Sequence, residues 1–304
     1  MANKIDYKFS IPANPTVKRG QTCQLTASPD GTQILYPAGN NIIIRNIEQP
    51  QNCTIYAEHG KPTTVARYSP NGQWVASADS CGKLKIWNPN QEESFNLTTK
   101  YEYMLLGGEI KDVAWDGESK RIAIAGDGRG SCANAIMFDT GSNVGDFTGI
   151  PKRLNSCDLR KQRPFKCVVG CDDFSSIFFQ GPPFKFVKSN LDNTNYISCT
   201  RFSPDGSLYA ASSIDGNITF YDGKDATKLF NIEKGHTGGV YAVDWNQNSS
   251  TLASASADKT VKLWDANTQQ NVASIPMFLT NSVIHIMKYK TLLKIFFLFV
   301  LGLR

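Results

Sequence analysis

Three residue types that can form a catalytic triad occur close together in the C-terminal third of the chain. They are His236, Ser254 and Asp258, and Trp264 follows them. In a hydrolase, an imidazole takes the proton of the serine hydroxyl while a carboxylate orients the imidazole. The same groups, together with an indole N–H, can instead satisfy one another in a buried hydrogen-bonded relay. The surrounding sequence decides between the two interpretations.

The four residues belong to a repeat frame that runs from Gly235-His236 to Trp264-Asp265. Within it, alternating or small apolar residues separated by turn residues predict three strands of about five residues each. These strands are expected at 240–245, 251–256 and 260–264. A frame that opens with Gly-His, closes with Trp-Asp and encloses three strands is typical of one blade of a WD40 β-propeller. We therefore interpret the four residues as a structural tetrad and not as a catalytic site.

The frame recurs along the chain at the position that closes each third strand. The closing residues are Asn46, Asn88, Asp139, Gly181, Asp222 and Asp265. By subtraction they are separated by 42, 51, 42, 41 and 43 residues, close to the roughly 40–45 residues of a WD40 repeat. The long second interval predicts an insertion, which we place in the Gly- and Ser-rich segment 126–134.

Tight turns recur in phase with these positions. Ser-Pro-Asp-Gly or Ser-Pro-Asn-Gly occurs at 28–31, 69–72 and 203–206, and 116–119 and 247–249 occupy equivalent places. Proline presets one turn position and glycine supplies a positive φ at another. Six repeats are therefore recognisable, and the fold class is an all-β WD40 propeller.

Closure of the ring is open at this point. Propellers hold four to eight blades, and an open ring leaves strand edges unpaired. Segment 7–17 could supply a strand that closes a six-bladed ring, or a seventh blade could be missing or formed by the C-terminal residues. We expect an incomplete seven-bladed ring that spans residues 1–277.

Residues 278–304 do not continue the repeat. Their apolar run at 292–301 contains about ten residues and a lysine, whereas a membrane-spanning helix needs about twenty apolar residues. We expect a tail foreign to the fold, with a tendency to aggregate when exposed; a membrane anchor is the alternative. The propeller itself is expected to have no membrane partner.

Charge and cysteine usage exclude several kinds of site. The net charge is +5, but four basic residues and no acids lie in 279–304, which leaves +1 for the remainder. No basic stripe indicates nucleic-acid binding. Eight cysteines occur without a paired framework, and Cys167 and Cys171 lack a second pair at zinc spacing. We expect no metal site.

No cofactor and no enzymatic activity are expected either. Gly126-Asp127-Gly128 lacks the lysine and the following helix of a phosphate-binding loop. The N-terminus, MANKIDYKFS, has no apolar signal core, so we expect a reducing, cytoplasmic location.

Several segments outside the generic repeat resemble the actin-interacting protein 1 family. The resemblance runs in order from about Phe9 to Met277. The segments are PANPT with RGQ at 12–21, IIIRNI at 42–47, GEIKDVAW at 108–115, DTGSNVG at 139–145, GPPFKF at 181–186, and KGH with GGVYA at 234–242. Together they are more specific than any Gly-His/Trp-Asp frame.

The resemblance implies both an architecture and a function. Members look like two seven-bladed propellers in a chain of about twice this length, of which this chain would cover most of the first. The expected partners are actin filaments and cofilin (ADF), with the protein promoting filament severing and disassembly at the actin cytoskeleton. No chemistry is implied, because binding a strained, cofilin-decorated filament better than a bare one shifts it towards breakage.

The resemblance also assigns binding residues to this chain. The expected actin- and cofilin-binding residues are Asp172, Lys185, Phe186 and Tyr196, the last where the family commonly has phenylalanine. The sequence departs from the family at Gly128-Arg129-Gly130, where a Gly-Arg-Glu loop would place an acidic contact.

The residues around Lys185 support an interface independently, although more weakly. Gly181-Pro182-Pro183 should break the strand and push the segment off the blade. Phe184 and Phe186 then alternate about Lys185, so that one ring can face inward and the other outward, and an exposed aromatic residue beside a lysine suits an interface. Both rings could also cover the blade edge. The competing function is a general WD40 scaffold, such as a substrate receptor of a ubiquitin ligase, which would use the central face of the ring.

Overall fold

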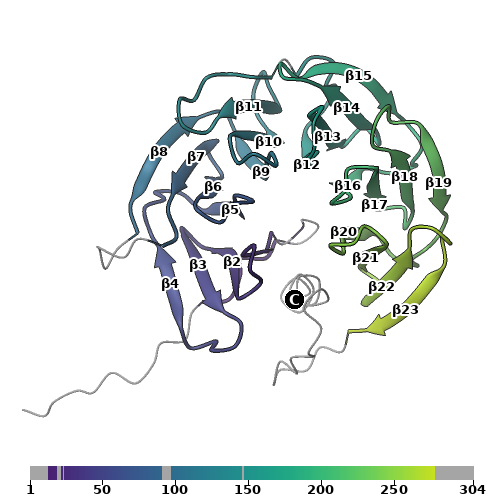
Figure 1. The fold of residues 1–304 in the computed structure, drawn as a ribbon, viewed down its shortest axis with the longest axis horizontal. Helices are drawn as coiled ribbons and strands as arrows, with labels where there is room; N and C mark the ends of the chain where they lie inside the picture. The colour runs from purple at the N-terminus through teal and green to yellow at the C-terminus, as the bar shows by residue number, and fades with distance from the viewer. Residues whose placement is uncertain (1–12, 19–21, 23, 91–96, 146, 278–304) are drawn as a thin grey trace, which may run out of the picture.

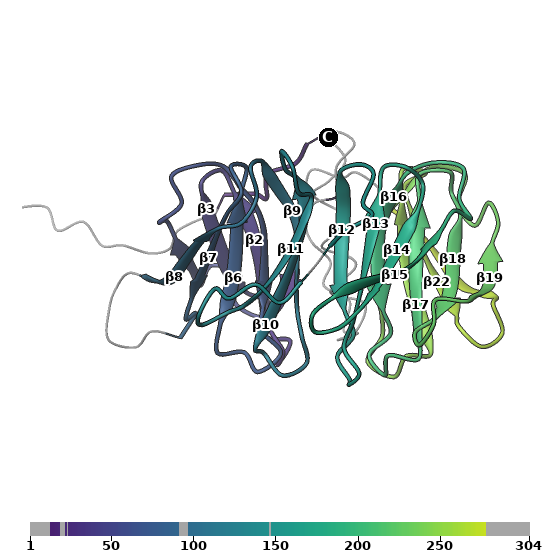
Figure 2. The same ribbon diagram turned by 90° about the horizontal axis from the view of Figure 1, so that it is seen from above.

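The computed structural model describes residues 13–18, 22, 24–90, 97–145 and 147–277. In this part of the chain, antiparallel sheets follow one another around a central axis and form six blades of a β-propeller (Figure 1). Turned by 90°, the blades stand side by side with their strands running between two faces of the disc (Figure 2). The all-β propeller that the repeats predict is confirmed.

Within each blade the strands follow chain order from the axis outwards. The first blade contains β1 (Thr26–Ala27), β2 (Gln33–Ala38), β3 (Asn41–Asn46) and β4 (Cys53–Tyr56); the second β5 (Thr63–Tyr68), β6 (Val75–Asp79), β7 (Lys83–Trp87) and β8 (Thr99–Met104); the third β9 (Glu109–Trp115), β10 (Arg121–Asp127) and β11 (Ala133–Met137); the fourth β12 (Leu154–Leu159), β13 (Lys166–Cys171), β14 (Ser176–Gln180) and β15 (Lys185–Asn190); the fifth β16 (Ile197–Phe202), β17 (Leu208–Ser213), β18 (Ile218–Asp222) and β19 (Lys228–Ile232); and the sixth β20 (Val240–Trp245), β21 (Thr251–Ser256), β22 (Thr260–Asp265) and β23 (Asn271–Pro276).

The strands expected in the sixth blade form where the alternation of residues places them. β20 and β21 have the predicted bounds, and β22 extends one residue further, to Asp265. The turns expected between first and second strands are also confirmed. In three of them a glycine has a positive φ, between 68° and 75°, at Gly31, Gly72 and Gly206, a conformation that L side chains seldom adopt.

The excess length of the third repeat does not lie where we placed it. The loop between β10 and β11 covers residues 128–132, scarcely longer than the 214–217 and 257–259 loops of later blades. The link from β7 to β8 covers 88–98, whereas the corresponding links are 223–227 and 266–270. Glycine-rich composition marks a loop but does not measure its length, so the insertion was assigned to the wrong loop.

Hydrophobic clusters join each blade to the next. The cluster shared by the second and third blades includes Leu84, Ile86, Ile110 and Trp115. Similar clusters join the first blade to the second, the third to the fourth, the fourth to the fifth and the fifth to the sixth. Since successive side chains of a strand point to opposite sheet faces, each inner blade contributes to two such cores.

The described blades leave an opening in the ring between β2–β4 and β20–β23 (Figure 1). Apolar clusters also lie on the two sheet faces that do not pack against another blade. They are built around Ile34, Tyr36 and Ile43 in the first blade and Ala253, Ala255 and Val261 in the sixth. This arrangement agrees with an incomplete ring and not with a closed ring of six blades.

The described part of the N-terminal segment forms no strand. Residues 13–17 have no strand assignment, although they lie along β2. The Thr16 amide donates to the Pro37 carbonyl at 2.9 Å, and the Tyr36 hydroxyl donates to the Ala13 carbonyl at 3.0 Å. Residues 7–12 and the C-terminal segment 278–304, with its expected tail, lie outside the described residues. Among described residues, no helix is long and apolar enough to cross a membrane.

Candidate functional site

The Ser, His and Asp of the sixth blade form a buried relay with Trp264. His236 Nδ1 lies 2.9 Å from Asp258 Oδ2, and His236 Nε2 lies 2.7 Å from Ser254 Oγ. Trp264 Nε1 donates to the same Oγ at 2.7 Å. Burial lowers the pKa of His236, although Asp258 opposes the shift. With a neutral ring, the network places the proton on Nδ1, and Ser254, fully buried, is positioned as a structural link.

A second relay lies in the second blade, at the histidine and tryptophan that match His236 and Trp264 in the repeat frame. His59 Nε2 is 2.8 Å from Ser77 Oγ, and Trp87 Nε1 donates to that hydroxyl at 3.0 Å. Asp79 Oδ2 is 3.7 Å from His59 Nδ1, and this nitrogen has no hydrogen-bond partner in the described part of the chain. The signal was present: Ser77 and Trp87 have the same separation as Ser254 and Trp264. The acid comes two positions earlier than in the sixth blade, so the repeat frame alone did not predict a complete second relay.

Three of the four expected binding residues lie at opposite ends of the fourth blade's sheet, and the fourth, Tyr196, directly precedes the fifth blade. Asp172 follows β13, and Tyr196 precedes β16 at the same face of the ring. Lys185 begins β15, after two further reversals of the chain. The antiparallel register fixes this separation: one end holds the pairs Leu154–Cys171 and Ser176–Asn190, and the other holds Leu159–Cys167 and Gln180–Lys185. Asp172 and Tyr196 come together; Lys185 and Phe186 form a separate surface.

The surface around Lys185 belongs to the blade. β15 pairs with β14 along its length, so the Gly-Pro-Pro segment makes a turn and does not push the chain off the sheet. The reason is that prolines in a reversal leave the ladder of the following strand intact. The two rings do not face opposite sides of the sheet, because side chains two positions apart on a strand share a face. Phe184 is fully buried and its ring stacks on Phe147. Phe186 is 44% exposed, and its ring meets Phe179 of the same cluster at a centroid distance of 6.2 Å.

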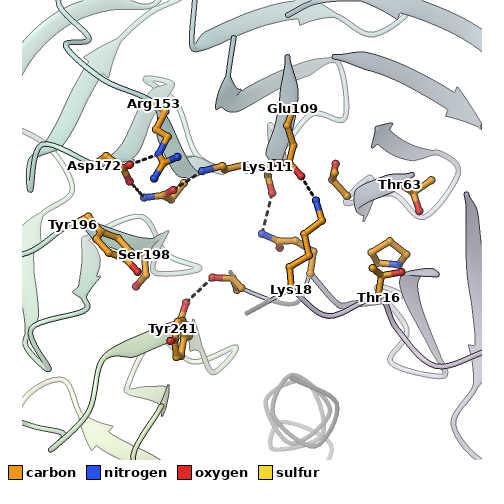
Figure 3. Close-up of a pocket in the computed structure, with 15 residues that line it drawn as sticks. Thr16, Lys18, Thr63, Glu109, Lys111, Arg153, Asp172, Tyr196, Ser198 and Tyr241 are labelled. Atoms are coloured by element: carbon orange, nitrogen blue, oxygen red, sulfur yellow. Dashed lines mark hydrogen bonds and ion pairs between the residues drawn. The ribbon is translucent and has the colours of Figure 1, made fainter. Parts of the chain in front are cut away.

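Asp172 and Tyr196 line a pocket in the centre of the ring. The cavity measures about 270 Å³ and takes side chains from all six blades and from the N-terminal segment (Figure 3). It lies at the face where the inner strands β5, β9, β12 and β16 begin. The N-terminal segment crosses this face: Lys18 pairs with Glu109 at 2.7 Å, and the Thr22 hydroxyl donates to the Tyr241 carbonyl at 3.0 Å.

Charged side chains form a connected row along one wall of the pocket (Figure 3). Arg153 Nε donates to Asp172 Oδ2. Asn155 Nδ2 donates to Asp172 Oδ1 at 2.6 Å, and Asn155 Oδ1 accepts from Lys111 Nζ at 2.9 Å. Asp172 is only 15% exposed, whereas Arg153 is 54% exposed. The carboxylate expected to contact a partner is therefore occupied within the protein, and its arginine is the more accessible charge.

A buried carboxylate connects the pocket to the interior. Asp112 accepts hydrogen bonds from Arg67 Nη2 at 3.0 Å and Arg201 Nη1 at 2.9 Å. It also accepts from the Cys157 amide at 3.2 Å, so it joins β5, β9, β12 and β16. Burial raises its pKa, but Arg201 and Arg67 outweigh burial and hold the pKa below its usual value. Gln24, in the pocket wall, accepts from the same Arg67 nitrogen at 2.7 Å.

The loop at 128–130, which departs from the family pattern, has a backbone conformation at Gly130 that favours glycine. Gly130 has a φ of 92° and lies in open space, so a side chain there would be strained without meeting a neighbour.

The described residues contain no group of three or more His, Cys, Asp or Glu side chains that could hold a metal ion. Burial raises the pKa of Cys171 to about 12, and Cys167 is also a buried free thiol.

Comparisons with known proteins agree with the fold and the repeats. The family model described as WD domain, G-beta repeat, matches residues 50–88, 184–222 and 227–265. WD repeat-containing protein 1 of Xenopus tropicalis is 46% identical over 262 residues, which are 86% of this chain and 43% of that protein. The protein of the same name from Rattus norvegicus is 44% identical over 274 residues, 90% of this chain and 45% of the relative.

A third relative carries a more informative name. Actin-interacting protein 1 of Drosophila melanogaster is 38% identical over 264 residues, which are 86% of this chain and 43% of that protein. The chain thus spans less than half the length of these curated relatives. The similarity to these three relatives extends over 86–90% of this chain. The chain therefore belongs to the WD-repeat family of WD repeat-containing protein 1 and actin-interacting protein 1.

Proposed function

We propose that this chain binds actin filaments and cooperates with cofilin (ADF) to promote filament severing and disassembly. The observation that carries the proposal is the 38% identity, over 86% of the chain, to a protein named for its interaction with actin. The activity would reside in binding, with no chemical step. A protein that binds a strained, cofilin-decorated filament more tightly than a bare one shifts the filament towards the strained state by its difference in affinity.

Two surfaces at opposite ends of the fourth blade are proposed as the contacts, and one of them extends to the start of the fifth blade. Phe186 and Lys185 form an exposed aromatic and cationic pair on the outermost strand, next to Val187, which is 46% exposed. Tyr196 and Asp172 lie at the central pocket. Exposed aromatic residues beside a basic group are typical of residues that dominate binding energy. Because the two surfaces lie at opposite ends of the blade, we propose that they contact different parts of the decorated filament.

Truncation of one aromatic residue tests the outer surface. Phe186→Ala should weaken binding to cofilin-decorated filaments by about tenfold or more, because a dominant interface residue contributes at least 2 kcal/mol. The chain provides a matched control: Leu229 is the second residue of β19, as Phe186 is of β15, and is 49% exposed. Leu229→Ala should leave binding unchanged. Equal binding by both variants in a co-sedimentation assay would contradict the proposed role of Phe186.

The second candidate function is a general WD40 interaction scaffold, such as a substrate receptor of a ubiquitin ligase. The central pocket favours it, since residues from all six blades converge there and concave sites are where ligands are usually bound. If the folded protein does not pellet with actin filaments, either with or without cofilin, this result would favour the scaffold function over the actin function.

A further inference from the structure

Among the described residues that line the central pocket, one cation has no carboxylate within ion-pair distance. Of the five charged groups in its wall, Lys18 pairs with Glu109 and Arg153 pairs with Asp172. Lys111 Nζ donates to the neutral Asn155 amide oxygen, and among the described residues no carboxylate lies within ion-pair distance of it. An ammonium group offers three donors, so two remain for a ligand.

Arg153 adds further donors beside this lysine. Its Nε is used on Asp172, while its two terminal nitrogens make no hydrogen bond to any described residue. The proximity of Arg153 and burial of the lysine both lower the pKa of Lys111, burial being the larger cause. Glu109 and Asp172 oppose this shift without removing it. A negatively charged ligand would therefore be stabilised in this pocket.

We propose that this pocket receives an aspartate or glutamate side chain of the protein partner, with its carboxylate between Lys111 and Arg153. The proposal rests on the proposed function in placing a protein at this face. A guanidinium group and an ammonium group together match a carboxylate by charge and by hydrogen-bond donors. Tyr196 and Tyr241, which border the same pocket, supply amphipathic walls for the aliphatic part of the side chain.

The size of the cavity favours a protein side chain over a free cofactor. Sites for drug-sized ligands usually enclose about 300–1,000 Å³, and this pocket, at about 270 Å³, falls below that range. The pocket is also partly open, and Tyr196 and Lys18 both line it (Figure 3). One acidic side chain on an extended segment can enter such a pocket while its backbone stays on the rim.

A short acetylated oligoglutamate peptide is the direct probe, measured by calorimetry at low ionic strength. Wild-type protein should bind it, and Lys111→Met should weaken binding by about tenfold or more, because hydrogen bonds to charged groups are strong. Lys111→Arg should retain most of the affinity. Lys100→Met is the matched control: it removes the same charge from the outer strand β8, where Lys100 is exposed. Added salt should weaken binding.

Inorganic phosphate and free glutamate serve as competing probes. If either binds as tightly as the peptide and displaces it, the site takes a free anion and the inference is overturned. If wild-type protein and Lys111→Met bind the peptide equally, the inference is also overturned, whatever the result with actin. Peptide binding that depends on Lys111, in a protein that does not pellet with filaments, supports the pocket and rejects the proposed actin function. Failure of the pocket inference and failure of the proposed actin function therefore give different experimental results.

Discussion

At the scale of residues, the histidines of the two relays are held neutral by their surroundings. Burial is the larger cause in both; Asp79 in the second blade and Asp258 in the sixth only partly oppose it. Burial lowers the pKa of His59 to about 4, in spite of the nearby Asp79. A Ser-His-Asp set thus serves folding in this protein, because the serine hydroxyl in each blade is buried between the histidine and the tryptophan. The same residue types in an exposed pocket would be positioned for chemistry.

The first prediction concerns pH. The folded pKa of His59 lies below the unfolded value of about 6.5, so between these values the unfolded chain binds more protons. The free energy of unfolding should therefore rise as the pH increases from about 4 to about 6.5, and His59 contributes up to about 3 kcal/mol to this rise. Denaturant unfolding at several pH values measures the slope. His59→Gln should reduce it, and an unchanged slope in that variant would contradict the account.

At the scale of elements, the turn before β15 and the strand itself place two aromatic rings at different depths of one cluster. The turn at 181–183 returns the chain to pair with β14, and Phe184 and Phe186, two positions apart, both lie against the cluster that contains Phe179. Phe184 enters the core shared by the third and fourth blades, where its ring centroid lies 6.0 Å from that of Phe147. Phe186 stays at the surface. Two aromatic residues two positions apart therefore have different roles.

The second prediction compares these two rings. Phe184→Ala should lower the free energy of unfolding by about 3–5 kcal/mol, because truncating a buried phenylalanine loses transfer energy and leaves a cavity. Phe186→Ala should lower it by less than about 1 kcal/mol, since the side chain is partly exposed. Urea denaturation of both variants gives the comparison. A loss for Phe186→Ala as large as that for Phe184→Ala would show that the Phe186 ring contributes to the stability of the blade and contradict the prediction.

Element positions were largely predictable, whereas the combination of residues at the site was not. The strands around Val240 and Thr251 follow from alternation and turn residues alone, which are local signals. The insertion before β8 was misplaced because no local signal measures loop length. The separation of Asp172 from Lys185 follows from strand direction once each strand is assigned. The pocket brings Lys18 and Arg153 together because distant repeats are arranged around one axis. Residue spacing along the sequence does not predict such a juxtaposition.

At the scale of the whole molecule, one buried carboxylate ties four blades together. Asp112 binds Arg67 of the second blade and Arg201 of the fifth, both largely buried, as well as the Cys157 amide of the fourth. An incomplete ring lacks the mutual support of a closed one, so such cross-ring contacts carry more of the rigidity. They also hold Gln24, and with it the wall of the central pocket.

The third prediction tests the contribution of these Asp112 contacts to stability. Asp112→Ala leaves two buried guanidinium groups without their shared carboxylate, and should lower the free energy of unfolding by about 3–5 kcal/mol. Asp139→Ala, which removes an exposed carboxylate from the same repeat, should change it by less than about 0.5 kcal/mol. Chemical denaturation followed by tryptophan fluorescence measures both. Similar values for the two variants would mean that the hydrophobic cores alone hold the ring together.

The central claim is that this propeller recognises actin filaments and prefers those decorated with cofilin. Co-sedimentation of the wild-type chain with filaments, in the presence and absence of cofilin, tests it most directly. The account predicts that more protein pellets when cofilin is present, at equal filament concentration. Protein that stays folded and monomeric yet remains in the supernatant under both conditions would contradict the claim.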